Sequence, residues 1–195
     1  MKKSLGATPI AIPSPVWMIG SYSADATANL MVASWCGICS SNPPCIALSV
    51  KQSRLTYQNI IEHDAFTVNI PSQDQVCLVD YVGTVSGKDE AKFIATGLTS
   101  VKSELVDAPY VKECAMNIEC KLIHAMDIGI HTQFIGQIVD VKADKRILDG
   151  NLNPSVKKLK PIIASASDRS YYAVGEYIGQ VYHIGNKQVN IPQNF

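Results

Sequence analysis

The chain has 195 residues, of which 47% are hydrophobic and 17% are charged, and its 17 Lys and Arg residues balance 17 Asp and Glu residues. This composition excludes intrinsic disorder as the main state, because disorder needs low hydrophobicity and high charge. A neutral chain also lacks the cationic field that binds a phosphate backbone, so we expect no nucleic-acid partner. At about 150 residues per domain, the length predicts one domain over residues 1–195.

The N-terminal quarter is poor in charge, since only Asp25 is charged between Leu5 and Val50. A stretch with so little charge must be largely shielded from water, either by the rest of the domain or by a subunit interface or a bound cofactor. Prolines and asparagines interrupt its apolar runs, so none reaches the ~18 residues of a membrane span. Pro13 and Pro15 also interrupt the apolar region that a signal peptide would need. We therefore expect a cytoplasmic protein with no membrane partner.

Strands are predicted from alternating or wholly apolar runs that turn residues bound. In chain order they are Val16–Tyr22, Asn29–Ala33, Cys45–Val50, Phe66–Ile70, Asn117–His124 and His131–Ala143. The fourth alternates apolar and polar residues with a period of two. Gly136 marks a bulge or a close approach within the last strand. The tail at 171–185 is rich in Tyr and Gly and ends in a polar stub.

Short helices are expected between these strands, over Arg54–Glu62, from Ser72 to about Tyr81, and from Asp89 to Gly97. Ser53 opens the first helix, and Ser72 with Gln75 forms a capping box for the second. Asp89 caps the third helix, and Gly97 ends it. Because strands dominate, the pattern favours an antiparallel β-barrel with helical insertions over a βαβ sheet. Neither a G-x-G-x-x-G motif nor a phosphate-binding P-loop is present.

The six cysteines include one C-x-x-C motif, Cys36 and Cys39. A zinc site would need a second pair or suitably spaced histidines, so we expect no metal. Trp35 before the motif gives it a passing similarity to a thioredoxin redox motif. We expect buried, reduced thiols instead.

The segment Asn29-Leu-Met-Val-Ala-Ser-Trp-Cys-Gly37 mixes small residues with one large aromatic residue. Small residues let a planar ligand lie against backbone N–H and C=O groups, which suit the polar edge of a flavin. A tightly packed strand in a subunit interface explains the same composition, and the residues alone leave both interpretations open.

The segment Ser49-Val-Lys-Gln-Ser-Arg-Leu-Thr56 places two cations and two hydroxyl groups at the start of the first predicted helix. Unpaired N–H groups and the positive end of the helix dipole make that place an anion site, which would fit a phosphomonoester. An ordinary Ser-capped helix with solvated cations is the alternative.

A second glycine-bearing loop, Gly83-Thr-Val-Ser-Gly-Lys-Asp89, is placed to wrap the ribityl or phosphate end of a ligand. After it, we expect Phe93 in the core and Lys92 in solvent. His131, at the start of the last strand, is placed to face the mouth of an active site.

Taken together, these segments resemble the flavin reductase-like, flavoredoxin-type family, whose fold is the FMN-binding split barrel. The resemblance extends over about residues 8–185 and rests on the order and spacing of the motifs. They are Pro15-Val-Trp-Met-Ile-Gly20, 29–37, Ser41-Asn-Pro-Pro44, Ser49-Val-Lys51, Thr56-Tyr57, Phe66-Thr-Val-Asn-Ile-Pro71, Asp80-Tyr-Val-Gly83, Ser86-Gly-Lys-Asp89, Lys92-Phe93, Ala95-Thr-Gly-Leu98, Ala108-Pro109, Ile118-Glu-Cys-Lys121, Phe134-Ile-Gly136, Tyr171-Tyr172 and Gly175-Glu-Tyr-Ile-Gly179.

The resemblance implies a homodimer of antiparallel Greek-key split barrels that holds FMN non-covalently near the subunit interface. The residues implied at the isoalloxazine ring are Ala33, Ser34, Trp35 and Cys36, and those beside the ribityl chain are Ser49, Val50 and Lys51. The phosphate is expected at Ser53 and Thr56, with Arg54 or Lys51 as charge partner. The other side would be closed by Tyr81, Val82, Gly83, Ser86 and Gly87. Asn29 and Lys92, which belong to the matching motifs, complete the implied cofactor-binding set.

His131 is the implied catalytic residue. Family members often carry a Gly-(Asp/Ser)-His turn that faces the flavin and the nicotinamide, and here Gly129-Ile-His131 lacks the polar middle residue. The leading hypothesis is an NAD(P)H-dependent flavin reductase that passes hydride from NADH or NADPH to bound FMN, with a flavin-dependent oxygenase as partner. The alternative is a flavoredoxin-type electron carrier with tightly held FMN and a protein redox partner, which the missing polar residue slightly favours. A flavin-free binding module is the third hypothesis.

Overall fold

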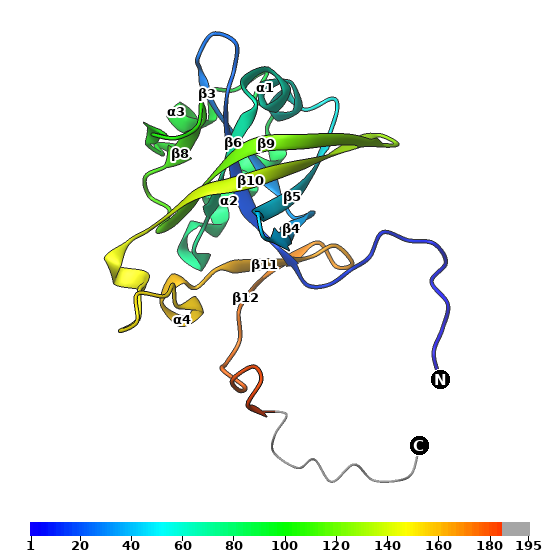
Figure 1. Cartoon of the computed structure of the whole chain (residues 1–195). Helices are drawn as coiled ribbons and strands as arrows, with labels where there is room; N and C mark the ends of the chain where they lie inside the picture. Colours follow the sequence, from blue (N-terminus) through cyan, green and yellow to red (C-terminus); the bar gives the residue numbers. More distant parts are fainter. Residues whose placement is uncertain (185–195) are drawn as a thin grey trace.

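The computed structural model describes residues 1–184, and its largest element is a seven-stranded sheet (Figure 1). The strand order is β3-β2-β6-β9-β10-β5-β4, and all neighbours are antiparallel. The strands are β2 (Trp17–Tyr22), β3 (Ala28–Ala33), β4 (Cys36–Ser41), β5 (Pro44–Lys51), β6 (Ala65–Ile70), β9 (Met116–Ile128) and β10 (His131–Ala143). The predicted antiparallel, mainly β architecture is therefore confirmed.

Short elements surround this sheet. Two small sheets hold β1 (Ser14–Pro15), β11 (Ile162–Ser165) and β12 (Ser170–Ala173), and β7 (Ser100–Lys102) with β8 (Pro109–Val111). The helices are α1 (Leu55–His63), α2 (Val76–Thr84), α3 (Lys92–Thr96) and α4 (Val156–Leu159), with 3-10 turns η1 (Gln73–Gln75) and η2 (Lys145–Ile147). Helix α1 packs on β2, and both α2 and α3 pack on β3. Helix α1 also contacts β3, so the starts of α1 and α3 both lie near this edge strand.

The core consists of two clusters of buried apolar side chains. The larger lies between the strands of the main sheet and includes Ile46, Leu48, Phe66 and Phe134. The second lies between β2, β3 and the helices α2 and α3. Because both faces of the β2–β3 hairpin are covered, its near-continuous apolar sequence is what such a strand pair requires.

Strand β6 alternates as predicted, but all six of its residues are buried. Its polar side chains form hydrogen bonds with β8, which belongs to a separate small sheet. The Thr67 Oγ1 donates to the carbonyl of Pro109 at 2.6 Å, and the Asn69 Oδ1 accepts from the N–H of Val111 at 2.8 Å. These hydrogen bonds satisfy polar groups that burial would otherwise leave without partners.

Gly136 is both a bulge and a close approach. The β9–β10 register shifts between Ile135 and Gly136. A Cβ atom added at Gly136 would lie 2.4 Å from Cζ of the buried Phe66 and 3.0 Å from Cβ of Cys120. Glycine is therefore required here for packing and not for its backbone freedom.

The helix boundaries correct three predictions. Helix α1 begins at Leu55 with Arg54 as its N-cap, so Ser53 does not cap it. Asp89 likewise does not cap α3, whose N-cap is Ala91. The capping box at Ser72 is present, but it starts η1, and the helix that follows extends beyond Tyr81 to Thr84.

Two strand predictions also change, whereas other local predictions agree with the structure. Strand β4 was not predicted, and β9 extends to Ile128, four residues beyond the predicted end. The bounds of β10 and the left-handed C-cap at Gly97 agree with the predictions. In the tail, β12 ends at Ala173, and the predicted end at Gly185 lies outside the described residues.

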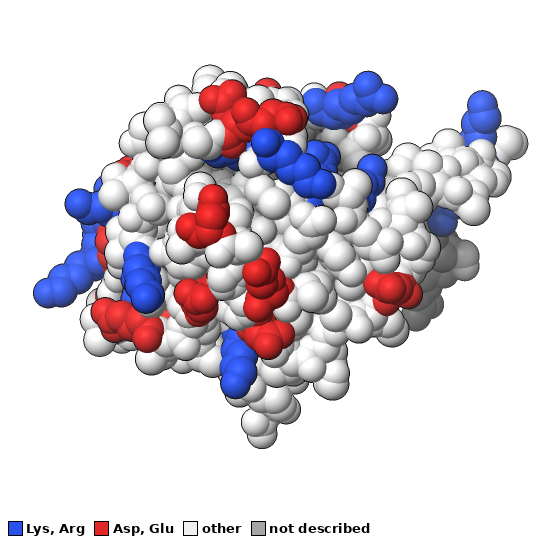
Figure 2. Space-filling model, turned by 90° about the horizontal axis from the view of Figure 1, so that it is seen from above, with Lys and Arg blue, Asp and Glu red and all other residues white. Residues whose placement is uncertain are grey.

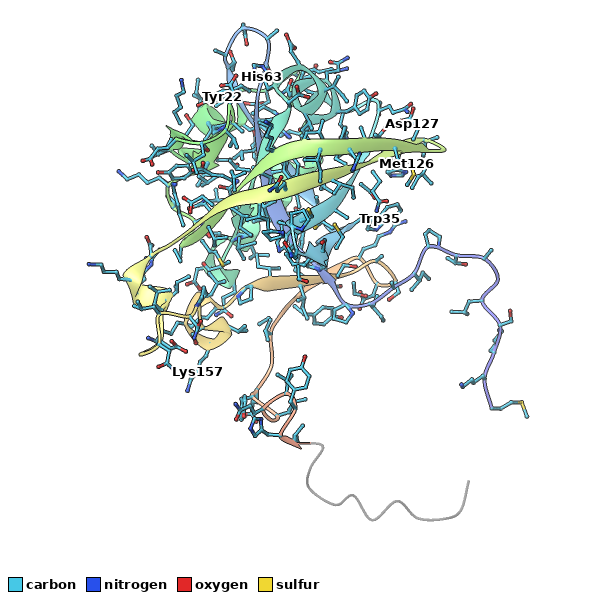
Figure 3. The ribbon with its side chains drawn as sticks, viewed as in Figure 1. Tyr22, Trp35, His63, Met126, Asp127 and Lys157 are labelled. Carbon is cyan, nitrogen blue, oxygen red and sulfur yellow. The ribbon has the colours of Figure 1, made fainter. Side chains whose placement is uncertain are left out.

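The tip of the β9–β10 hairpin, the N-terminal segment and residues 174–184 project from the body of the molecule (Figure 1). The hairpin tip carries exposed apolar side chains, among them Ile128, Ile130 and Met126, which is labelled in Figure 3. Viewed from above, basic and acidic side chains are interspersed on the surface (Figure 2). Within residues 1–184, none of the helices has the length and apolar character to cross a membrane.

Candidate functional site

Two adjoining cavities lie along β3, and we call them cavity A and cavity B. Cavity A has a volume of about 120 Å³ and is bounded by β3, the start of α1, the end of α2 and the start of α3. Cavity B has a volume of about 260 Å³ and lies between β3, β5 and the start of β10. Met31, Val32 and Arg54 line both, so the two cavities meet there.

The structure brings most of the predicted site residues to these two cavities. Around cavity A lie Asn29, Ser53, Arg54, Thr56, Val82, Gly83, Ser86, Gly87 and Lys92. Around cavity B lie Ala33, Ser34, Trp35, Ser49, Val50, Lys51, Arg54 and His131. Cys36 and Tyr81 line neither cavity. The role of the lining residues toward a cofactor stays a prediction.

The start of α1 forms one wall of cavity A. Its N-cap, Arg54, has extended backbone angles, and no side chain accepts a hydrogen bond from the first turn. The first N–H groups of a helix have no partner within the helix, and the helix dipole makes this end positive. Thr56 in this turn is buried, and its Oγ1 accepts from Asn29 Nδ2 at 3.0 Å. This wall therefore offers N–H donors and a fixed hydroxyl group to an anion.

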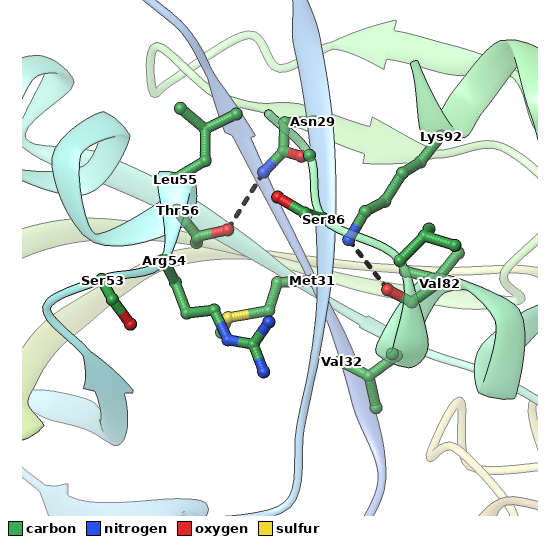
Figure 4. A pocket seen from close by; sticks show the side chains of 13 residues that line it. Asn29, Met31, Val32, Ser53, Arg54, Leu55, Thr56, Val82, Ser86 and Lys92 are labelled. Atoms are coloured by element: carbon green, nitrogen blue, oxygen red, sulfur yellow. Dashed lines mark hydrogen bonds between the residues drawn. The ribbon is translucent and has the colours of Figure 1, made fainter. Parts of the chain in front are cut away.

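Lys92 forms the opposite wall, and the expectation that it is solvated was wrong. As the first residue of α3 it is only 4% exposed, and its Nζ donates to the carbonyl of Val82 at 2.8 Å (Figure 4). Burial, with a smaller contribution from the positive charge of Arg54, lowers the pKa of Lys92 to about 8. An ammonium group has three N–H donors, and among residues 1–184 the structure pairs it with Val82 alone.

Arg54 and Lys92 come from different elements but line the same small cavity (Figure 4). Two cations at one cavity repel each other when it is empty of anions, which is the reason that Arg54 lowers the pKa of Lys92. A doubly charged anion between them would remove this repulsion and form charge-assisted hydrogen bonds with both. The donor set of cavity A therefore fits a phosphomonoester.

Cavity B has an aromatic wall. The rings of Trp35 and His131 lie with their centroids 5.0 Å apart and their planes tilted by 35°. Strand pairing fixes this contact, because His131 is opposite Lys51 in the β5–β10 register and Ser49 N donates to Trp35 O at 3.0 Å. The small side chains of Ala33, Ser34 and Ser49 also line this cavity, and they leave room for a planar ring beside the strand backbone.

Cys36 is partly buried, packs against the core and does not line the cavities. Its Sγ donates to the carbonyl of Ala33 at 3.7 Å, and the side chain packs against the larger cluster. Burial raises the pKa of the Cys36 thiol to about 12, so it is not a reactive thiolate at neutral pH. Cys39, the other half of the C-x-x-C motif, is exposed, so the expectation of burial was wrong for it.

Sequence reasoning missed Met31, Val32, Leu55 and Val85, which all line cavity A. Met31 and Val32 stand inside the segment 29–37 that was singled out, so its central residues could have been included. Leu55 and Val85 carry no chemical signal of their own. Within the part of the chain that the structure describes, no group of His, Cys, Asp or Glu residues is arranged to bind a metal.

Comparisons with known proteins agree with this geometry. Residues 10–160 match the model of the flavin reductase-like domain. The flavoredoxin of Desulfovibrio vulgaris (Miyazaki F) is 48% identical, with a TM-score of 0.91 over 95% of this chain and 100% of that chain. The flavoredoxin of Methanosarcina acetivorans is 31% identical, with a TM-score of 0.88 over 95% and 98%.

A structure from Shewanella frigidimarina NCIMB 400, described as having a split barrel domain, is 25% identical, with a TM-score of 0.79 over 88% of this chain and 87% of that chain. Together with the strand order, this likeness agrees with the predicted split barrel. The chain therefore belongs to the flavin reductase-like family, whose members support a flavin-binding oxidoreductase as its general function.

Proposed function

We propose that the protein holds FMN non-covalently, with the phosphate in cavity A and the isoalloxazine ring in cavity B. The observation that carries this proposal is the pair of cations at one small cavity: Arg54 lies at the uncapped start of α1, and buried Lys92 lies on the opposite wall. The cavities adjoin at Met31, Val32 and Arg54, and the ribityl chain of the proposed ligand would lie along these residues. Two of the similar solved structures are flavoredoxins, which supports the choice of a flavin.

In this proposal, the residues of the chain bind FMN, orient it and shield its ring from water. Arg54, Lys92 and the first turn of α1 fix the phosphate, and this sets the depth at which the ring enters cavity B. Trp35 and His131 cover one side of that ring. The strand backbone beside Ser49 offers hydrogen bonds to its polar edge. Bound FMN supplies the redox chemistry, and the protein tunes it through these contacts.

For electron flow, we propose a flavoredoxin-type carrier that exchanges electrons with a redox partner protein. The 48% identity to a flavoredoxin over nearly the whole chain supports this role. An NAD(P)H-dependent flavin reductase, which would serve a flavin-dependent oxygenase, is the second candidate. The observation that favours it is the volume of cavity B, which is about twice that of cavity A and has His131 in its lining.

We also propose that a second copy of the chain covers the hairpin tip and the neighbouring apolar surface. Ile38, which is 65% exposed, belongs to the charge-poor N-terminal quarter. Ile130, which is 68% exposed, directly precedes His131 in the lining of cavity B. Exposed apolar patches of this kind mark interfaces. Light scattering of the purified protein should give twice the chain mass, and a monomer would contradict the proposal.

Titration with FMN and with riboflavin tests the binding proposal. FMN should bind at one equivalent per chain and should bind more tightly than riboflavin, because riboflavin lacks the phosphate for cavity A. Equal affinities would contradict the placement of the phosphate. Anaerobic mixing with NADH or NADPH then separates the two roles: rapid bleaching of the flavin supports the reductase, whereas retention of FMN on dialysis without bleaching supports the carrier.

A further inference from the structure

A third cavity, cavity C, adjoins cavity A. It has a volume of about 200 Å³ and is lined by the loop before α3 and by the β2–β3 turn. Asn29, Leu55 and Gly87 line both cavity A and cavity C. These three residues therefore form a partition between the two cavities.

The partition is closed because Asn29 and Gly87 are in close contact. A Cβ atom added at Gly87 would lie 2.1 Å from Oδ1 of Asn29 and 3.2 Å from Cδ2 of Leu55. No side chain fits between them, so the backbone of residue 87 packs directly on the Asn29 amide. A group the size of a phosphate cannot pass at this point.

The Asn29 amide is held in position by its own hydrogen bonds. It is buried, and its Nδ2 donates to Thr56 Oγ1 at 3.0 Å and to Ser21 Oγ at 3.5 Å. Ser21 Oγ also accepts from Asn59 Nδ2 at 3.0 Å, which ties the partition to the buried face of α1. Moving the amide aside would break buried hydrogen bonds, each of which is costly to leave unmade.

Size and charge on the two sides of the partition differ. Cavity A, at about 120 Å³, holds a terminal phosphate but not a nucleoside, because drug-sized ligands need about 300–1,000 Å³. Beyond the partition, the acidic residues Asp89 and Glu90 line cavity C, and Lys88 is the single basic residue in the same lining. This surplus of negative charge repels a second phosphate.

We propose that Asn29 and Gly87 make this site selective for a flavin mononucleotide over a flavin dinucleotide. The inference rests on the proposed binding of FMN, whose phosphate is the end of the molecule. In FAD the same phosphate is joined to a second phosphate, which carries adenosine. The partition blocks this continuation, and the carboxylates of cavity C disfavour it.

The test compares dissociation constants for FMN, FAD and riboflavin, measured by flavin fluorescence at neutral pH. The wild-type protein should bind FMN at least tenfold more tightly than FAD, and FAD should resemble riboflavin. Asn29→Ala opens the partition, so the ratio of the FAD and FMN constants should fall at least several-fold. Adding Glu90→Gln to Asn29→Ala should lower the ratio again, because the pyrophosphate then meets less negative charge.

Two single variants in cavity C serve as matched controls. Glu90→Gln and Thr27→Ala alone should leave the ratio at its wild-type value, since the partition still separates them from the ligand. Asn29→Ser keeps a short polar side chain and replaces Asn29→Ala if the latter does not fold. Melting temperatures of all variants show whether the fold is intact.

The outcomes are distinct. Equal wild-type affinities for FMN and FAD, or an unchanged ratio in a folded Asn29 variant, would overturn the selectivity while leaving FMN binding in place. Failure of the wild-type protein to bind FMN at all would overturn the proposed function, and the selectivity would fall with it.

Discussion

The Nζ atom of Lys92 lies 2.8 Å from the carbonyl oxygen of Val82, so the end of α2 holds a buried ammonium group at the wall of cavity A. The pKa of Lys92 is lowered to about 8, first by burial and second by Arg54. Below this pH the group carries its charge, and above it the charge is lost.

The affinity for FMN should therefore be highest below about pH 8 and should fall as the pH rises through the pKa of Lys92. The second pKa of a phosphomonoester is about 6, so the ligand itself stays a dianion over this range. Dissociation constants measured from neutral pH upward check this. Lys92→Arg, which keeps its charge because the pKa of arginine is above about 12, should give a flat profile. An equally steep fall in that variant would show that another group titrates.

Ser53→Ala combined with Thr56→Ala should weaken FMN binding, because both hydroxyl groups border cavity A beside the uncapped start of α1. Hydrogen bonds to charged groups are worth ~1.5–3 kcal/mol each, which corresponds to at least about a tenfold loss of affinity. Calorimetric titration with FMN measures the change. Ser23→Ala, which borders cavity C, is the control and should bind FMN normally. Unchanged affinity in the double variant would place the phosphate elsewhere.

Bound FMN should quench the emission of Trp35, since this ring lines cavity B and contacts His131 with centroids 5.0 Å apart. The chain has two tryptophans, and the other, Trp17, packs against the core. Trp17 lies opposite Ala33, which lines cavity B, so bound FMN should quench it as well. Trp35→Phe should therefore reduce the quenching that FMN causes without abolishing it. Quenching that comes from Trp17 alone, with no contribution from Trp35, would show that the flavin ring does not lie beside Trp35.

Gly136→Ala should destabilise the fold, because its new Cβ would lie 2.4 Å from Phe66 Cζ in the core. Overpacking of this kind costs about 1–3 kcal/mol. Urea unfolding measures the loss. Gly150→Ala is the matched control, since nothing lies within 4 Å of the added atom. A Gly136 variant as stable as this control would contradict the packing described here.

The antiparallel fold and most of the lining of the cavities were predictable from the sequence, because strand alternation and the motif order are local signals. Strand β10 and the glycine at residue 136 are examples. The family resemblance also assigned both Asn29 and Thr56 to the cofactor site. In the structure, a hydrogen bond of 3.0 Å joins their side chains.

Other features depend on tertiary contacts that no local pattern contains. Lys92 looks like a solvated lysine in sequence, and only the packing of α2 and α3 on β3 buries it. Ser53 resembles a helix cap, yet the turn before α1 gives that position to Arg54. The contact of Gly87 with Asn29 joins residues 58 positions apart, so the partition between cavities A and C could not be predicted.

A crystal structure of the protein grown with FMN would show where the cofactor binds. We expect the phosphate in cavity A, within hydrogen-bond distance of Lys92 Nζ and the first turn of α1, and the flavin ring beside Trp35. A flavin whose phosphate lies away from Arg54 and Lys92, or crystals with no flavin in either cavity, would contradict this expectation.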